Sequence, residues 1–208
     1  MASHGHSAMV SPRIREKRRR RQAEILHAAL RAFREKGYYA TTLDDIAERL
    51  DIRKTALYHY FPDKEAILYQ CHRESLGEVD RFVKDARQQF TTADAQLRYI
   101  IQEHVRVMTE TLEGSPLAFE VTALSDERQQ EIIRARDRYE RGLRKIIEHG
   151  IRDGEFRSVN SKIAVFAILG AINWIARWYQ PEGPICTAEL GRGFADQLVG
   201  GLRCRPQP

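Results

Sequence analysis

Apolar side chains recur every three or four residues from Arg18 almost to the end of the chain, and this spacing restricts the fold more than any other feature. Glycine, proline and helix-capping residues divide the pattern into separate segments, as at Gly37 and Pro62. No segment has the strict apolar–polar alternation of a strand followed by a hairpin turn. The sequence therefore predicts an all-α fold of about nine helices, without an internal repeat.

Basic residues gather at the front of the chain. The 208 residues carry a net charge of +5, and seven of the nine residues from Arg13 to Arg21 are lysine or arginine. After Ala66 the basic and acidic residues balance. A basic front joined to a neutral remainder predicts that the front binds a polyanion while the remainder has another role.

Two short helices joined by Asp51–Ile52–Arg53 match the dimensions of a DNA-binding helix-turn-helix. The basic segment leads into the preceding helix as an arm that follows the DNA backbone or enters a minor groove. The outward-facing side chains of the second helix and the residues at helix ends suit groove edges and phosphates. The candidate DNA contacts are Arg18, Arg19, Arg20, Thr42, Arg53, Lys54, Thr55, Tyr58, His59, Tyr60 and Lys64. The alternative is a solvated helical bundle with a basic tail.

The stretch from Ala40 to Leu68 resembles the DNA-binding segment of the TetR/AcrR family of bacterial repressors. The family pattern reads here as Thr41-Thr42, Ile46-Ala47, Leu57-Tyr58-His59-Tyr60-Phe61 and Lys64-Glu65. The resemblance implies a homodimer on a palindromic operator, released when a small ligand enters the C-terminal lobe. The usual glycine of the turn is replaced by Asp51, which tolerates a left-handed backbone better than most residues, so we expect the turn to survive. Arg53 and Thr55 also depart from the pattern and alter the groove-facing chemistry.

These features divide the chain into three parts. We expect a disordered basic arm over residues 1–17, a helix-turn-helix domain over 18–66, and a ligand-binding and dimerisation domain over 67–208. The longest apolar run, Ile163 to Ile172, has ten residues, about half the length of a membrane-spanning helix. The three cysteines are far apart, and the chain opens without a secretory leader. We therefore expect a cytoplasmic protein that does not enter a membrane.

Two segments of the back half, Asp137–Phe156 and Gly170–Pro184, resemble TetR-family members that sense acyl-CoA thioesters in fatty-acid, sterol or aromatic-acid breakdown. Such a ligand needs an apolar tunnel for the acyl chain and cationic or hydrogen-bonding groups for the phosphates and amides. His104 and Tyr139 also fit an ordinary role in the core. The candidate ligand contacts are Leu76, Val79, Val83, His104, Met108, Leu112, Phe119, Arg136, Tyr139, Asn173, Trp174 and Arg177.

The helix predicted over residues 161–180 is apolar nearly all round, which predicts burial on both sides. With the last helix, where Gly191 and Gly193 permit close approach, it is expected to form the four-helix dimer seam typical of the family. The candidate interface residues are Phe166, Trp178, Leu190, Phe194, Leu198 and Leu202.

Short catalytic and metal-binding motifs are absent from the sequence. We therefore expect no enzymatic activity, no cofactor and no metal. The leading interpretation is a ligand-released dimeric repressor that binds double-stranded DNA and senses an acyl-CoA. The first alternative is a repressor of efflux genes that senses a lipophilic drug or metabolite. The second is an enzyme, or a helical protein whose basic arm binds anionic membrane.

Overall fold

A computed structural model describes residues 11–112, 116–180 and 182–204. For residues 116–119 only the backbone is described. Eight α-helices, a π-helical turn (η1) and a 3-10 segment (η2) form the described part of the chain. Their bounds are α1 Pro12–Lys36, α2 Leu43–Arg49, α3 Lys54–Tyr58, α4 Lys64–Gln89, α5 Ala93–Arg106, η1 Val107–Thr111, η2 Pro116–Ala123, α6 Asp126–Arg152, α7 Ser161–Trp178 and α8 Thr187–Gly200. The prediction of an all-α fold is confirmed.

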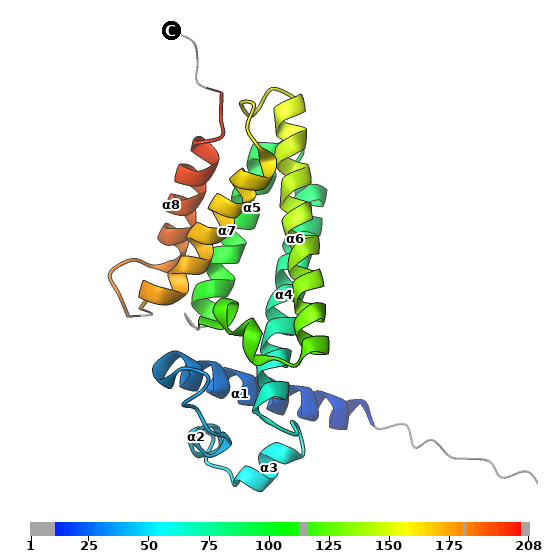
Figure 1. Cartoon of the computed structure of the whole chain (residues 1–208), viewed down its shortest axis with the longest axis vertical. Coiled ribbons are helices and arrows are strands. Elements are labelled where there is room, and N and C mark those ends of the chain that lie inside the picture. The colour runs from blue at the N-terminus through cyan, green and yellow to red at the C-terminus, as the bar shows by residue number, and fades with distance from the viewer. Residues whose placement is uncertain (1–10, 113–115, 181, 205–208) are drawn as a thin grey trace, which may run out of the picture.

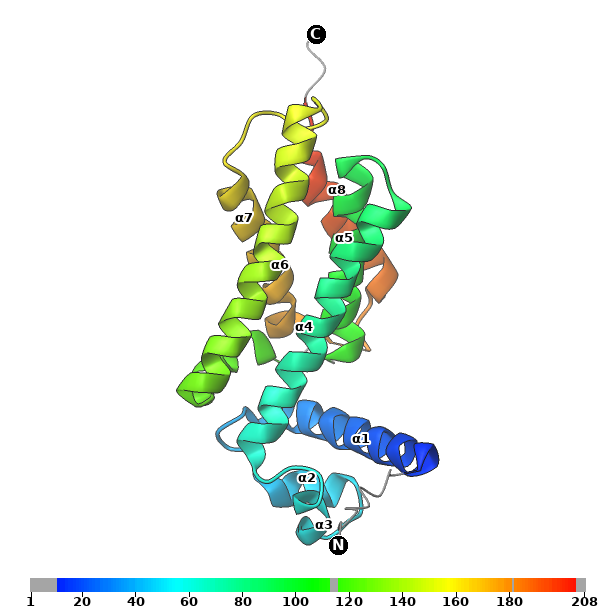
Figure 2. The ribbon, with the colours of Figure 1, turned by 90° about the vertical axis from the view of Figure 1, so that its right-hand side faces the viewer.

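The helices form two lobes (Figures 1 and 2). α1, α2 and α3 lie together at one end, with α1 crossing the long axis of the molecule, and α5 to α8 build the larger lobe. α4 belongs to both lobes, since it starts beside α1 and runs up into the bundle. The two lobes are therefore joined by one continuous helix.

Local sequence signals fix the two short helices of the small lobe. Thr42 and Asp45 form a reciprocal capping box at the start of α2, in which each side chain accepts from the other's backbone amide. Asp51 has a φ of 52°, so the turn after α2 uses the left-handed conformation that the sequence predicted for it. Ile46 and Leu57 are fully buried, and α2 packs against both α1 and α3.

The basic arm differs from the prediction, because α1 starts at Pro12 and residues 12–17 are helical instead of disordered. Proline suits the first turn of a helix, arginine and lysine favour helix interiors, and Arg19 pairs with Glu16 at 3.3 Å. The rest of the expected arm, residues 1–10, lies outside the described residues.

α8 packs against α5 within the subunit. Gly191 faces α5, and a Cβ atom there would lie 3.4 Å from the Cα atom of Gln102, an ordinary van der Waals contact. The sequence pattern predicts that Gly191 lies in a seam between two subunits, whereas in the structure it packs within one subunit. Across the described ranges, no helix combines the length and apolar character needed to cross a membrane.

Candidate functional site

The small lobe presents α3 at the end of the molecule that lies farthest from the bundle (Figure 1). Tyr58 is 50% exposed, and Arg53, Thr55 and His59 are exposed with it. Lys54 lies half-buried, because its ammonium pairs with the Asp44 carboxylate at 2.7 Å. α3 therefore has an outward polar and aromatic face, as a helix that enters a DNA groove requires.

One basic residue of α1 contacts the end of α3, and the described basic residues belong to a helix instead of a separate arm. Arg18 donates from Nη2 to the backbone carbonyl of His59 at 3.4 Å, which places this turn of α1 beside the end of α3. Arg20 pairs with Glu24 at 3.5 Å and remains mostly exposed. The positive charge of α1 is thus held in a fixed position next to the expected DNA-reading helix.

Lys64 differs from the other predicted DNA contacts, because its ammonium points into the protein. It donates to the backbone carbonyls of Tyr38 at 2.7 Å and Thr41 at 2.6 Å, and lies 4.4 Å from the centre of the Tyr38 ring. The partial burial lowers the pKa of this amine. These contacts close the turn between α1 and α2, so we assign Lys64 a structural role there.

Polar contacts join α4 to the start of α6 where the two lobes meet. The Glu65 carboxylate accepts from the Ser125 backbone amide at 2.9 Å and pairs with Arg128 at 3.1 Å. The Ser125 amide is the largest cause of the lowered pKa of Glu65. One turn further along α4, Tyr69 donates to Glu131 on α6. A movement of α4 relative to α6 must therefore alter these contacts at the edge of the DNA-binding lobe.

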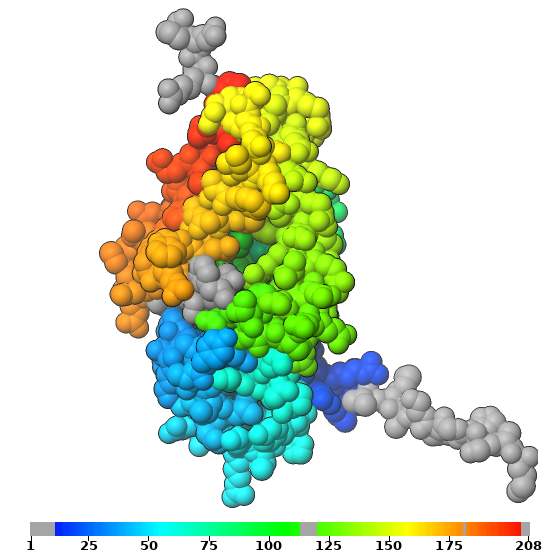
Figure 3. All heavy atoms as spheres, in the orientation of Figure 1, coloured from blue at the N-terminus to red at the C-terminus, as the bar shows by residue number. Residues whose placement is uncertain are grey.

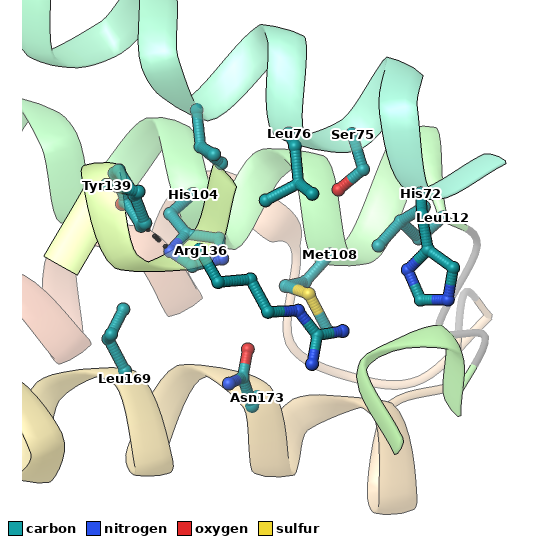
Figure 4. Close-up of a pocket in the computed structure, with 11 residues that line it drawn as sticks. His72, Ser75, Leu76, His104, Met108, Leu112, Arg136, Tyr139, Leu169 and Asn173 are labelled. Carbon is teal, nitrogen blue, oxygen red and sulfur yellow. Dashed lines mark hydrogen bonds between the residues drawn. The ribbon is translucent and has the colours of Figure 1, made fainter. Parts of the chain in front are cut away.

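The larger lobe encloses a cavity of about 130 Å³ between α4, α5, α6, η1 and α7 (Figure 4). Figure 3 shows the surface hollowed between α6 and α7. Met108 reaches the cavity from η1, a π-helical turn, and such turns are frequent at functional sites. The lining residues are His72, Ser75, Leu76, Val79, His104, Met108, Leu112, Arg136, Tyr139, Leu169 and Asn173.

Eight of the twelve predicted ligand contacts meet at this cavity, and three described ones do not. Val83 lines a basic hollow between α4 and α6 instead, and Trp174 and Arg177 lie on the exposed side of α7. The side chain of Phe119 falls outside the described residues.

Three residues that line the cavity are not among the predicted ligand contacts. They are His72, Ser75 and Leu169. His72 lies four residues before the predicted Leu76 on α4, and Ser75 lies directly before it. Leu169 lies four residues before the predicted Asn173 on α7. Helical spacing from the predicted residues was the signal that places His72 and Leu169 on the same faces.

One side of the cavity carries a buried hydrogen-bonded pair. The Tyr139 hydroxyl and Nδ1 of His104 lie 3.1 Å apart, joined by the dashed line in Figure 4. Burial lowers the pKa of His104 to about 4 and raises that of Tyr139. Both side chains are therefore neutral at pH 7.

The other side carries His72 and the end of Arg136, which extends its guanidinium across the cavity (Figure 4). His72 is 2% exposed, and its Nε2 has no hydrogen-bond partner among the described residues. Burial, and to a smaller extent the positive charge of Arg136, lower the pKa of His72 to about 3. None of the described residues that line the cavity is acidic, so the site favours neutral or anionic groups over cations.

α7 leaves a row of large apolar side chains on the surface of the subunit. Phe166 is 54% exposed, Trp174 59% and Trp178 43%. The helix was expected to be buried on both sides, and within one subunit only one side is. Leu190 and Leu202, also predicted for the interface, are instead buried in the subunit's own core. The remaining two candidates, Phe194 and Leu198, are half-buried against that core.

A helix-turn-helix with a fixed basic helix beside it, joined by one helix to a lobe with an internal cavity, defines a DNA-binding regulator. Residues 25–71 match the family described as "Bacterial regulatory proteins, tetR family". Residues 91–202 match "Tetracyclin repressor-like, C-terminal domain". The chain belongs to the TetR family, as the motif resemblance predicted, and is a transcriptional repressor of that family.

Three known proteins illustrate the relationship. The transcriptional repressor KstR2 of Mycolicibacterium smegmatis is 27% identical over 192 residues, which cover 88% of this chain and 90% of the relative. The TetR-family regulator PfmR of Thermus thermophilus has a TM-score of 0.77 and 34% identity, with 86% of this chain and 99% of that chain covered. A structure of AibR in complex with isovaleryl coenzyme A and operator DNA has a TM-score of 0.74 and 24% identity, with 88% and 98% covered.

Proposed function

We propose that the chain represses transcription as a homodimer bound to a palindromic operator, and that a short acyl-CoA thioester releases it. The observation that carries this proposal is the cavity, which has no acidic lining residue among those described and borders the helix that continues into the DNA-binding lobe. The fold shared with AibR, whose structure contains isovaleryl coenzyme A and operator DNA, supports the same ligand class.

The size of the cavity limits which part of the ligand enters. An engineered cavity of roughly 150 Å³ accepts benzene, whereas sites for drug-sized ligands measure about 300–1,000 Å³. At about 130 Å³ the cavity accepts a short acyl group and excludes the nucleotide part of coenzyme A. The nucleotide then lies outside, and Trp174 and Arg177 on the exposed side of α7 offer it an aromatic surface and a cation.

Phe166 and Trp178, two members of the exposed row on α7, belong to the proposed dimer surface. Phe166 and Trp178 are large and apolar, and residues of this type anchor the centres of protein interfaces. Figure 1 shows α7 and α8 on the same side of the bundle, where α8 packs on α5. Two subunits that meet through α7 and α8 would present two copies of α3 to a palindromic operator.

Release follows from the position of α4. An acyl group that pushes on His72 and Leu76 displaces α4 relative to α6, and the same helix carries Glu65 at the contact with Ser125 and Arg128. Such a displacement would change the spacing of the two copies of α3. A ligand acts in this way only if it binds the released conformation more tightly than the operator-bound one.

Fluorescence anisotropy tests this function on a labelled duplex taken from the region upstream of the protein's own gene. We expect the purified protein to bind the duplex and isovaleryl-CoA to release it, whereas CoA or isovalerate alone does not. Release by lipophilic drugs, with no response to any thioester, would replace the acyl-CoA assignment by the efflux alternative. Tight binding to anionic vesicles, with equal affinity for every duplex, would overturn the repressor mechanism itself.

A further inference from the structure

A hollow on the surface of the larger lobe collects basic side chains from two helices. It measures about 400 Å³ and lies between α4 and α6, which run side by side in Figure 2. One acidic residue, Asp80, lines it together with five basic residues, which are Lys84, Arg87, Arg138, Arg141 and Lys145. We infer that this basic hollow is a second binding site, and that it takes an oligophosphate anion that bridges the two helices.

The spacing of the cations on each helix is the first support. Lys84 and Arg87 lie three residues apart on α4, so they share one face of that helix. Arg141 and Lys145 lie four residues apart on α6 and share a face in the same way. Like charges at this spacing destabilise a helix. Because both pairs line one hollow, each pair also repels the other, and an anion between them would reverse the sign of the interaction.

The lack of acidic partners is the second support. Within the part of the chain that the structure describes, none of the five cations forms an ion pair with a carboxylate. Arg144, on a neighbouring face of α6, behaves differently and pairs with both Glu140 and Glu148 at 3.7 Å. Asp80 lies seven residues before Arg87, which is about 10 Å along α4. The described protein groups therefore leave the positive charge of the hollow largely unbalanced.

The close approach of α4 and α6 is the third support. Gly142 directly follows Arg141, and Val83 directly precedes Lys84. A Cβ atom at position 142 would lie 3.2 Å from Cγ1 of Val83, closer than side-chain carbons normally pack. The glycine therefore lets the two helices come together at the place where their cations lie. Repulsion between those cations alone would favour a wider separation.

The size and the donors of the hollow indicate the ligand class. Sites for small ligands measure about 300–1,000 Å³, and the hollow falls within that range. Guanidinium groups present planar forks of donors that match phosphate oxygens, and lysine ammonium groups add point charges. An oligophosphate places several negative charges within a few bonds, so it can meet cations of both helices, whereas a single carboxylate cannot. Inorganic pyrophosphate and the phosphate chain of a nucleotide share this chemistry.

Calorimetric titration of the whole protein with pyrophosphate tests this inference. The buffer is free of magnesium and has constant ionic strength, because salt screens exposed charges. Arg87→Gln and Arg141→Gln, one on each helix, should each weaken binding, and the double variant should weaken it by about tenfold or more. The matched control is the double variant Arg81→Gln/Arg134→Gln, which removes the same charge from exposed positions of the same helices outside the hollow. This control should retain the affinity of the unsubstituted protein.

Equal losses in the two double variants would overturn the inference, since the overall positive charge would then account for the binding. Failure of the unsubstituted protein to bind pyrophosphate would overturn it as well. A loss in only one of the two single variants would overturn the bridge between the helices. Titrations with ATP and with inorganic triphosphate separate the two sources, because tighter binding of ATP supports a nucleotide and equal binding supports the phosphate chain alone.

A bridging anion also affects release, if release proceeds as proposed above. That mechanism needs α4 to move relative to α6, and an anion that holds both helices opposes the movement. Pyrophosphate should therefore raise the isovaleryl-CoA concentration that releases the operator, and Arg87→Gln/Arg141→Gln should abolish this shift. An unchanged concentration would overturn the coupling and leave the anion site standing. Failure of every thioester to release the operator would overturn the proposed function, whereas the calorimetric result does not depend on it.

Discussion

The DNA-binding lobe and the cavity differ in how their polar side chains are supplied with hydrogen-bond partners. In the lobe, capping, ion pairing and carbonyl contacts satisfy Thr42, Lys54 and Lys64 within the protein, and exposed groups such as Tyr58 meet solvent. In the cavity, His72 is buried with an unpartnered nitrogen. The first region satisfies its polar groups within the protein or exposes them to solvent, whereas the second holds a buried nitrogen to which the described residues offer no hydrogen bond.

The two regions depend on different forces. A surface of exposed cations interacts with phosphates over a distance and through displaced counterions, so salt controls it. A cavity of neutral histidines around one guanidinium depends on desolvation and on individual hydrogen bonds. The two regions should therefore respond differently to salt, pH and substitution, and each contrast is open to measurement.

The largest expected effect is that of salt on operator binding. Because Arg18, Arg20 and Arg53 lie on or beside the face of α3, several phosphates should be neutralised in the complex. Six or more such contacts would reduce operator affinity roughly 1,000-fold between 50 and 200 mM salt. Anisotropy titrations across that range measure the slope, with ligand affinity measured in parallel. A ligand affinity that falls as steeply would contradict the contrast.

Acid should next destabilise the larger lobe. His72 and His104 have pKa values of about 3 and about 4 in the fold, against roughly 6.5 in an unfolded chain. Between these values the unfolded chain binds more protons, so the free energy of unfolding falls as the pH falls. The two histidines together should reduce the free energy of unfolding by about 4 kcal/mol between pH 7 and pH 5.

Urea unfolding at pH 7, 6 and 5 measures this loss, and the His72→Gln variant should show a smaller one. Glu65, with its lowered pKa, stabilises the fold above its ordinary pKa and loses that contribution only in more acidic solution. A free energy of unfolding that stays constant from pH 7 to pH 5 would show that the histidines are not buried as described.

Substitution of Tyr58 should affect only the DNA-binding region. Tyr58→Ala removes an exposed side chain of α3, and loss of one base or phosphate contact weakens binding by about 1–3 kcal/mol. The same variant should keep the thermal stability and ligand affinity of the unsubstituted protein. Arg141→Ala, far from α3 on α6, is the matched control, and equal losses in both variants would refute the assignment of the DNA-binding face.

The smallest expected effect distinguishes the two possible roles of Lys64. Lys64→Met removes hydrogen bonds to the carbonyls of Tyr38 and Thr41 and should reduce the free energy of unfolding by about 1–2 kcal/mol. The loss of operator affinity should be smaller than that caused by Tyr58→Ala. Unchanged stability together with a large loss of operator affinity would instead indicate that Lys64 contacts a DNA phosphate.

The helices and the motif could be read from the sequence because both depend on local order. Apolar spacing identifies the buried face of each helix, and Asp51 could be predicted to take a left-handed conformation from its side chain alone. Leu76, His104 and Asn173, which were selected as ligand contacts from their helical positions, line one cavity.

What the sequence could not supply is the identity of the packing partner. Leu190 and Gly191 lie on an apolar face of α8 whether α5 or a second subunit covers it. Lys64 occupies the expected motif position, but the carbonyls that it contacts belong to a turn more than twenty residues away. The lowered pKa of His72 likewise depends on tertiary burial and on Arg136 from another helix.

The continuity of α4 has a thermodynamic consequence. Its 26 residues span about 39 Å without interruption, from the edge of the DNA-binding lobe past the cavity. If ligand binding at His72 weakens operator binding by a certain factor, linkage requires the operator to weaken ligand binding by the same factor. A repressor bound to its operator would then respond to a higher ligand concentration than the free protein, and the ratio of the two concentrations would equal the coupling carried by α4.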